Sequence, residues 1–169
     1  LTQYLIDQGH RRIVLVHGRK EAMVSMERLA GAHQAMERNG LPLTHDQIIY
    51  TNFLREEACD GVRRYLQTHD PRSVTAFLCM SDMLAIGAIE AIKSLGYKVP
   101  RDYSVVGYDG LDVTDFTDPR ITTIDQNIRL KGYEAAHLLM DMLDGKRPPQ
   151  RLVLPHILSV KDSVAPPAL

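Results

Sequence analysis

The sequence contains no tryptophan, only two cysteines and no long apolar run. Cys59 and Cys79 are far apart and sit in apolar surroundings, which argues against a disulfide framework or a metal knuckle. A membrane helix needs roughly 18 consecutive apolar residues, and none is present. The first residues also lack the charged and apolar regions of a signal peptide. We therefore expect a cytoplasmic protein without membrane contact.

The sequence also lacks an excess of positive charge. Its 20 Lys and Arg residues are matched by 21 Asp and Glu residues, for a formal net charge of −1. Proteins that grip nucleic acid use such an excess to neutralise phosphates, so this stretch alone is not expected to bind DNA. With 169 residues, 44% of them hydrophobic, the chain is long enough for a globular unit with a substantial core.

Enzyme signatures are missing as well. The sequence has no phosphate-binding loop, no G-x-G-x-x-G after the first expected strand, no G-x-S-x-G and no H-E-x-x-H. The histidines are scattered without metal-ligand spacing, and we expect His10 and His17 on the surface or in loops. A phospho-receiver domain would need paired acids after the first strand, where His17–Lys20 stands. We therefore predict no catalytic residue, no metal site and no cofactor.

Short β-branched apolar runs alternate with helical patterns along the first two-thirds of the chain, after an N-terminal stretch, Leu1–Ile6, that has helical character. The expected strands are Ile13–Val16, Gln47–Tyr50, Val74–Cys79 and Tyr103–Gly107, and the expected helices are Val24–Asn39, Glu56–Thr68 and Asp82–Leu95. Gly40 and Gly96 stand at the ends of two expected helices, where a residue in the left-handed backbone conformation commonly ends a helix. This alternation predicts an α/β fold, a parallel doubly wound sheet with flanking helices.

After Pro119 the pattern changes. We expect a strand at Ile121–Ile124, a helix at Ile128–Leu143, a break at Arg147–Pro149, a strand pair at Leu152–Leu154 and Ile157–Val160, and a frayed tail at Val164–Leu169.

In open α/β sheets, ligands bind beyond the carboxyl ends of the strands. Four expected strands end in polar stretches, namely His17–Lys20, Thr51–Phe53, Met80–Asp82 and Tyr108–Gly110. Carboxylates, an arginine and an aromatic ring are the groups that a hydroxylated ligand such as a sugar requires, because each buried hydroxyl needs a partner.

Each candidate also has a purely structural interpretation. Ser81 is suited to cap a helix, with Asp82 a favourable charge in its first turn. Asp109 before Gly110 fits a turn. Arg28 fits a surface ion pair, and Phe53 fits the core. The residues alone leave both interpretations open.

Several blocks, in order along the chain, resemble the LacI/GalR (lactose-repressor-type) transcriptional regulators. These blocks are Gly9–Ile13, Ser25–Gly31, Ser81–Ala88, Ser104–Asp109, Asp118–Gln126 and Leu154–Pro155. The resemblance implies a type I periplasmic-binding-protein-like fold of two subdomains. It assigns residues 1–121 to the C-terminal subdomain, 122–147 to a returning segment of the N-terminal subdomain, 148–163 to a final strand region back in the C-terminal subdomain and 164–169 to a tail. The DNA-binding helix-turn-helix is absent from this stretch.

The resemblance also implies a function, which is the binding of a sugar-like effector that controls DNA binding allosterically in a transcriptional repressor. The implied ligand-binding residues are Arg28, Asp109, Ser81 in the place usually held by Asn, Asp82, Gln126 at the hinge-side wall and Phe53 as a stacking ring. A homodimer would form through Ile86, Ile89 and Phe116, although Ile86 and Ile89 also fit an ordinary core face. Operator DNA would be bound through the absent N-terminal domain. A periplasmic sugar-binding protein of a transporter is the alternative.

Overall fold

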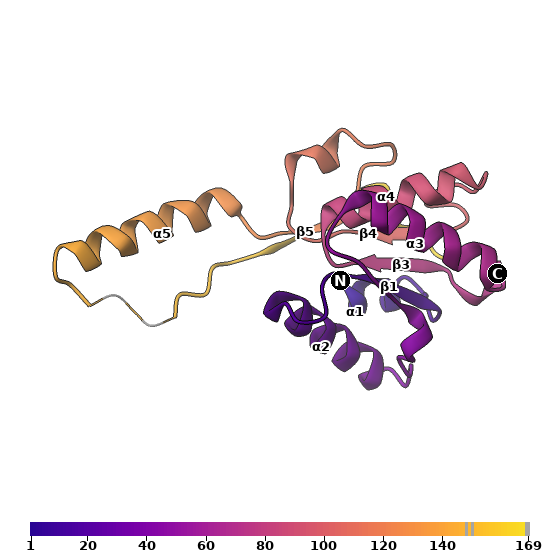
Figure 1. The fold of residues 1–169 in the computed structure, drawn as a ribbon, viewed down its shortest axis with the longest axis horizontal. Helices are drawn as coiled ribbons and strands as arrows, with labels where there is room; N and C mark the ends of the chain where they lie inside the picture. Colours follow the sequence, from indigo (N-terminus) through magenta and orange to yellow (C-terminus); the bar gives the residue numbers. More distant parts are fainter. Residues whose placement is uncertain (148, 150, 168–169) are drawn as a thin grey trace.

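A computed structural model describes residues 1–147, 149 and 151–167. Its body is a four-stranded parallel sheet in the order β2-β1-β3-β4, covered by helices on both faces (Figure 1). The strands are β1 (Ile13–His17), β2 (Ile48–Tyr50), β3 (Ala76–Cys79) and β4 (Ser104–Val106). The helices are α1 (Thr2–Asp7), α2 (Met23–Arg38), α3 (Arg55–Thr68) and α4 (Asp82–Ser94). The α/β prediction is confirmed.

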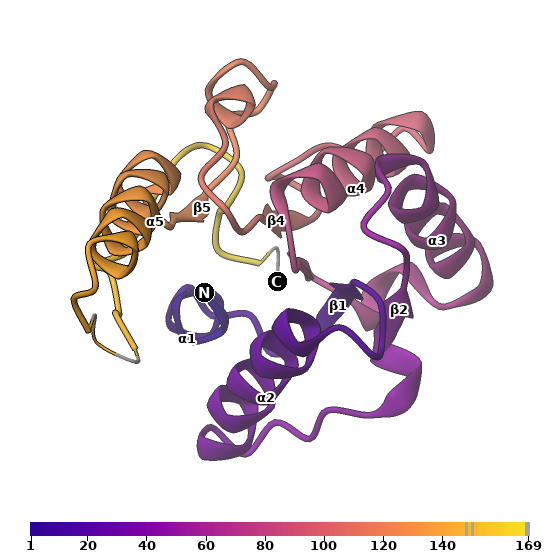
Figure 2. The same ribbon diagram turned by 60° about the vertical axis from the view of Figure 1, so that its left-hand side comes forward.

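Helices α1 and α2 cover one face of the sheet and α3 and α4 cover the other (Figure 2). The chain leaves β1 toward α2 on one face and leaves β3 toward α4 on the other. Because β1 and β3 are neighbours, the crevice between their carboxyl ends is the topological switch point of the sheet. A ligand site is expected there.

The core is built on strands buried on both faces, as the continuous apolar runs predict. Every residue of β1 and β3 is buried. Phe77 at the centre of β3 meets the rings of Tyr65 and Tyr103 edge to face, with centroids 6.4 and 5.8 Å away. Gly40 ends α2 with φ +67°, and the amide of Leu41 reaches back to the Met36 carbonyl, which satisfies the last turn.

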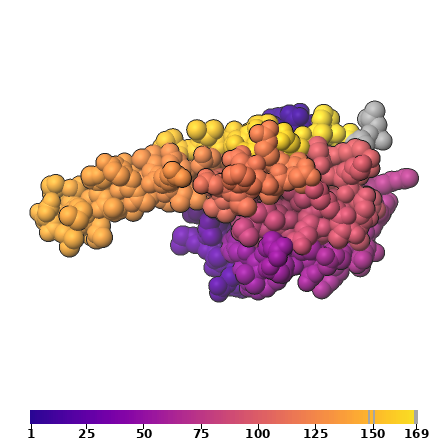
Figure 3. Space-filling model, turned by 90° about the horizontal axis from the view of Figure 1, so that it is seen from above, coloured from indigo at the N-terminus to yellow at the C-terminus, as the bar shows by residue number. Residues whose placement is uncertain are grey.

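A helical arm leaves this body. We define the arm as the described residues of the stretch 126–156, that is, without 148 and 150. It comprises α5 (Ile128–Leu143) and the returning chain, and its base is the antiparallel pair of β5 (Thr123–Asp125) and β6 (Ile157–Ser159). The space-filling view shows the arm as a narrow extension of the body (Figure 3). No residue of α5 is buried in this structure, and its exposed apolar side chains include Leu139, Met140, Met142 and Leu143.

One expected strand is wrong. Leu152–Leu154 forms no strand, and β6 pairs with β5 instead of with this segment. A hairpin between the two expected strands would have placed Pro155 first in a two-residue turn. Such turns need a positive φ at that position, which proline cannot adopt. In the break expected at 147–149, Pro148 lies outside the described residues.

The expected fraying of the tail is also wrong for residues 164–167; residues 168–169 lie outside the described part. The amide of Val105 donates to the Ser163 carbonyl over 2.9 Å, and the amide of Ala165 donates to the Ser104 hydroxyl over 3.0 Å. These bonds attach the C-terminal segment to the outer edge of β4.

The two histidines expected at the surface are buried, each with 1% of its surface exposed. The ring of His10 lies 2.9 Å from the Thr75 hydroxyl and 3.0 Å from the Ala165 carbonyl. The ring of His17 lies between the carbonyls of Gly18 and Ser25, 3.0 Å from each. Both rings thus have hydrogen-bond partners inside the protein, although a neutral His17 ring can donate to only one of its two carbonyls. The surface prediction is therefore corrected.

Two methionines of α2 provide a matched test of this core. Met36 has 1% of its surface exposed and Met26 has 58%. We expect Met36→Ala to lower the free energy of unfolding by about 2–5 kcal/mol, because it empties a packed site. Met26→Ala should change it by less than about 0.5 kcal/mol. Urea denaturation measures both, and equal effects at the two positions would contradict the described packing.

Candidate functional site

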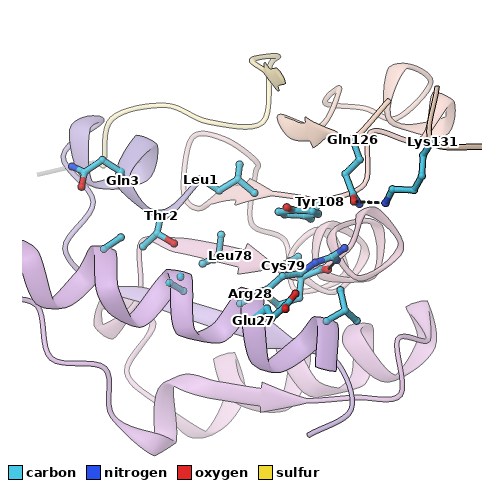
Figure 4. Close-up of a pocket in the computed structure, with 15 residues that line it drawn as sticks. Leu1, Thr2, Gln3, Glu27, Arg28, Leu78, Cys79, Tyr108, Gln126 and Lys131 are labelled. Carbon is cyan, nitrogen blue, oxygen red and sulfur yellow. Dashed lines mark hydrogen bonds between the residues drawn. The ribbon is translucent and has the colours of Figure 1, made fainter. Parts of the chain in front are cut away.

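A cavity of about 560 Å³ lies at the carboxyl ends of the central strands (Figure 4). It is therefore at the place that the topology predicts. Its lining comes from Leu1, Thr2 and Gln3; from Val24, Glu27, Arg28, Gly31, Ala32 and Ala35 of α2; from Leu78, Cys79 and Met80; from Tyr108; and from Gln126 and Lys131 of the arm.

A chain of hydrogen bonds crosses this cavity from the body to the arm. Arg28 Nη2 lies 3.0 Å from Asp109 Oδ1, and Gln126 Nε2 donates to the same oxygen over 2.7 Å. Lys131 Nζ in turn donates to Gln126 Oε1 over 3.0 Å (Figure 4). The structure thus brings together three of the predicted ligand residues. Arg28 and Gln126 line the cavity, and Asp109 is not part of the lining but is bonded to both of them.

Arg28 is held in a defined orientation. Its guanidinium lies over the ring of Tyr108, with Cζ 3.9 Å from the ring centroid, and Nη1 donates to the Met80 carbonyl. Only 13% of its side chain is exposed. A planar donor group fixed by stacking and by a carbonyl loses little freedom when it binds an oxygen ligand.

Asp109 occupies a strained turn between β4 and β5. Its φ of 125° lies in the region that favours glycine, and Gly110 follows at 76°. A residue with a Cβ is held in such a conformation only where its surroundings fix it. The turn is fixed by the bond from the Asp109 amide to the Ile124 carbonyl, at 3.1 Å. Burial raises the pKa of the Asp109 carboxyl, and the neighbouring Arg28 opposes this rise.

The arrangement offers fixed donors and a fixed acceptor side by side. A guanidinium donates to ligand oxygens, and a carboxylate accepts from ligand hydroxyls. Together they can bind two adjacent hydroxyl groups of one molecule. Asp109 and Arg28 carry opposite charges, so the pair adds no net charge to the cavity.

Ser81 and Asp82 do not line this cavity. Ser81 caps α4 by accepting from the Leu84 amide at 3.3 Å. Asp82 is fully buried, and its two oxygens accept from the Thr123 hydroxyl at 2.6 Å and the Leu111 amide at 2.7 Å. Because the Ser81 hydroxyl caps α4, both Asp82 oxygens are bound within the protein, and neither residue lines the cavity, we withdraw both from the ligand set.

Phe53 also lies away from the lining. It has a φ of 65°, and its ring packs on Gly18; a Cβ added at Gly18 would stand 2.0 Å from Phe53 Cζ. The ring therefore closes the loop after β1 against the loop after β2. Its packing leaves no support for a stacking role toward a ligand in the cavity.

Arg28 and Gln126 are the only predicted residues in this lining; those that were missed include Glu27, Tyr108 and Lys131. Glu27 and Tyr108 immediately precede the predicted Arg28 and Asp109. Lys131 lies in the first turns of α5, and its side chain reaches Gln126. No motif marks it, because its position depends on how the arm leaves the body.

The predicted dimer residues lie around a second feature, an open groove of about 600 Å³ on α4. Ile86 and Ile89 line it, and Thr117 and Asp118 form its far wall. Two ion pairs flank it, Arg55–Glu90 at 2.6 Å and Lys93–Asp118 at 3.0 Å. Phe116, next to this wall, has 87% of its surface exposed.

Within the described part of the chain, no group of three or more His, Cys, Asp and Glu residues could hold a metal ion. Over the same residues, no helix is both long and apolar enough to cross a membrane. Both cysteines are free and buried.

Known proteins resemble this chain over nearly its whole length. The model of the periplasmic binding protein-like domain family matches residues 2–164. The HTH-type transcriptional repressor CytR of Escherichia coli K12 is 38% identical over 145 residues, which cover 86% of this chain and 42% of that protein. The HTH-type transcriptional regulator CelR of Thermobifida fusca is 33% identical over 163 residues, covering 96% and 47%. The chain thus spans about half the length of the curated relatives it matches.

Solved structures share the fold. The structure of a CelR–cellobiose complex superposes with a TM-score of 0.88 at 33% identity, covering 96% of this chain and 49% of that one. A LacI family regulator from Enterococcus faecium with bound ribose gives a TM-score of 0.87 at 27% identity, covering 98% and 61%.

The ion pair in the cavity makes a pH-dependent prediction. In Arg28→Met, we expect the pKa of Asp109 to rise further, because burial then acts on the carboxylate without the opposing cation. A carboxyl whose folded pKa is raised makes the free energy of unfolding fall as pH rises from its unfolded pKa to its folded one. Titration followed by ¹³C NMR of the carboxyl carbons measures the shift. Asp102, which pairs with Arg101, is the control; an unchanged Asp109 pKa would contradict the pair.

Proposed function

Because the chain belongs to the periplasmic binding protein-like domain family, in the form found in LacI-type regulators, we propose that it is the effector-binding region of a transcriptional repressor. The observation that carries this proposal is the Arg28–Asp109 pair at the cavity between the body and the arm. A ligand that binds there contacts both parts. The transporter alternative is set aside, because the curated relatives are transcriptional regulators.

The proposed effector is a small hydroxylated molecule, a sugar or sugar derivative. Support comes from the paired donor and acceptor at the cavity and from the ring of Tyr108 beside them. Gln126 and Lys131 add an amide and a cation from the arm. Two similar structures, the CelR–cellobiose complex and the Enterococcus faecium regulator, hold cellobiose and ribose.

We assign residues 1–121 and 148–163 to one subdomain, with 164–169 as its tail, and residues 122–147 to a second subdomain. The exposed apolar side chains of α5 support this division, since an isolated amphipathic helix has little stability in water. The rest of the second subdomain would cover α5 and close the cavity. Ligand binding would then shift the angle between subdomains, as differential affinity for two states requires.

In the complete protein, this shift would change how two N-terminal helix-turn-helix domains sit on operator DNA in the cytoplasm. The near-neutral charge of the present chain is consistent with DNA contacts made elsewhere. A homodimer would hold the two reading domains. We place its interface at the α4 groove, with Phe116 of each copy packing against Ile86 and Ile89 of the other.

The effector proposal is tested by thermal unfolding of the complete gene product with mono- and disaccharides, nucleosides and purines. At least one compound should raise the melting temperature, since a ligand that binds only the folded state stabilises it. Asp109→Asn keeps the shape of the turn residue but removes the charged acceptor, so affinity should fall by about 10- to 100-fold.

Asp112→Asn is the matched control, because its side chain is 88% exposed near the same turn, and it should keep the ligand response. No shift with any compound would contradict the proposed ligand class. An equal response of the Asp109 and Asp112 variants would contradict the role of Asp109.

The dimer is tested with Phe116→Arg, which places a charge in the proposed apolar contact. We expect the dimer dissociation constant of the complete protein to rise by about 30-fold or more, as for the loss of an interface hot spot. Sedimentation velocity over a concentration series measures it. Met26→Arg changes an exposed side chain on α2 and should leave the dimer intact; equal behaviour of the two variants would place the interface elsewhere.

A further inference from the structure

We propose that Asp82 is a positioning residue for the effector site, holding Asp109 and Gln126 in place through hydrogen bonds rather than through its charge. This inference rests on the proposed function for the meaning of the site. Asp82 was predicted to contact the ligand, but its complete burial excludes such a contact.

Asp82 joins three elements that are distant in sequence. It is the first residue of α4, and its backbone amide donates to the Tyr108 carbonyl over 2.7 Å. Its side chain then accepts from Leu111, beyond the Asp109 turn, and from Thr123, the first residue of β5. One carboxylate therefore fixes both the turn that carries Asp109 and the strand that leads to Gln126.

The turn and the strand also bind each other. The amide of Asp109 donates to the Ile124 carbonyl over 3.1 Å, and the amide of Gln126 donates to the Asp109 carbonyl over 3.4 Å. The side chains of Asp109 and Gln126 then meet at 2.7 Å. A shift of β5 along the Asp109 turn would separate these two side chains. The register of β5 against this turn therefore sets the geometry of the site.

The turn that carries Asp109 is closely packed on both sides. A Cβ at Gly107 would stand 2.3 Å from Asp82 Oδ1, and a Cβ at Gly110 would stand 2.5 Å from the Cα of Asp125. The turn thus lies in contact with Asp82 on one side and with β5 on the other. Such confinement is what keeps Asp109 at its φ of 125°.

The two donors to Asp82 allow the contribution of its hydrogen bonds to be distinguished from that of its charge. A backbone N–H such as that of Leu111 can only donate, whereas the hydroxyl of Thr123 can donate or accept. An Asn at position 82 can therefore accept from Leu111 through its oxygen and donate to Thr123 through its amide. Asp82 forms no ion pair with any described residue, and burial raises its pKa, so its charge is a cost at this place.

The experiment compares Asp82→Asn with Asp82→Ala and Thr123→Ser with Thr123→Val. Amide hydrogen exchange is read at Leu111, Asp109 and Gln126 in the complete gene product. We expect exchange within about 3-fold of the parent for the Asn and Ser variants, because both bonds survive. Asp82→Ala should exchange about 10-fold faster or more at all three amides, and Thr123→Val at Asp109 and Gln126, in line with the net value of a lost hydrogen bond.

Binding of D-ribose and cellobiose is measured in the same variants. Weak binding by the Ala and Val variants with recovery in the Asn and Ser variants supports positioning. Equal losses for Asp82→Asn and Asp82→Ala would overturn it, since charge would then be the property that matters. Unchanged exchange in Asp82→Ala would overturn it as well. Should that variant fail to fold, the Thr123 pair decides by the same criteria. A parent that binds neither sugar counts against the proposed ligand class alone, and the exchange data still decide the role of Asp82.

Discussion

A carboxylate without exposed surface needs hydrogen-bond donors inside the protein. The donors to Asp82 are Leu111 and Thr123, which follow much later in the sequence. This requirement joins the first turn of α4 to the crossing between β4 and β5. The groove that we assign to the dimer lies farther along the same helix, and the cavity lies beside the same crossing. A displacement of the Asp109 turn or of β5 would therefore act on α4 through Asp82. A buried acid that binds no ligand is in this way central to the proposed site.

The cavity itself follows from sheet topology combined with one ion pair. Parallel strands direct their carboxyl ends to a single edge, and the change of direction between β1 and β3 opens the crevice there. Arg28 and Asp109 then provide opposite charges 3.0 Å apart, each supported by uncharged neighbours. Under the proposed function, such a site would recognise the pattern of hydroxyl groups on a ligand more than the net charge of that ligand. Gln126 and Lys131 extend the bonding to the arm, so a ligand at the proposed site would contact both parts of the molecule.

Local pattern was sufficient for the body of the fold and for part of the site. The apolar run of β1 and the glycine after α2 are determined by neighbours in the chain, and both occur as expected. Burial of His10 was not foreseen, because its partners, Thr75 and Ala165, come from remote segments. The role of Asp82 was missed for the same reason: its position at a strand end is common to ligand residues and to buried anchors. Only the long-range hydrogen bonds distinguish the two.

The attachment of the C-terminal segment to β4 has a consequence for synthesis on the ribosome. Thr122 and Ser163 cover the outer edge of β4. This edge therefore remains partly open while the residues between β4 and Ser163 are still being synthesised. At typical elongation rates of roughly 5–20 residues per second, that interval is on the order of seconds. An uncovered strand edge is a site for pairing with other chains. The outer edge of β4 is therefore covered only after Ser163 and Ala165 have been synthesised and have bonded to it.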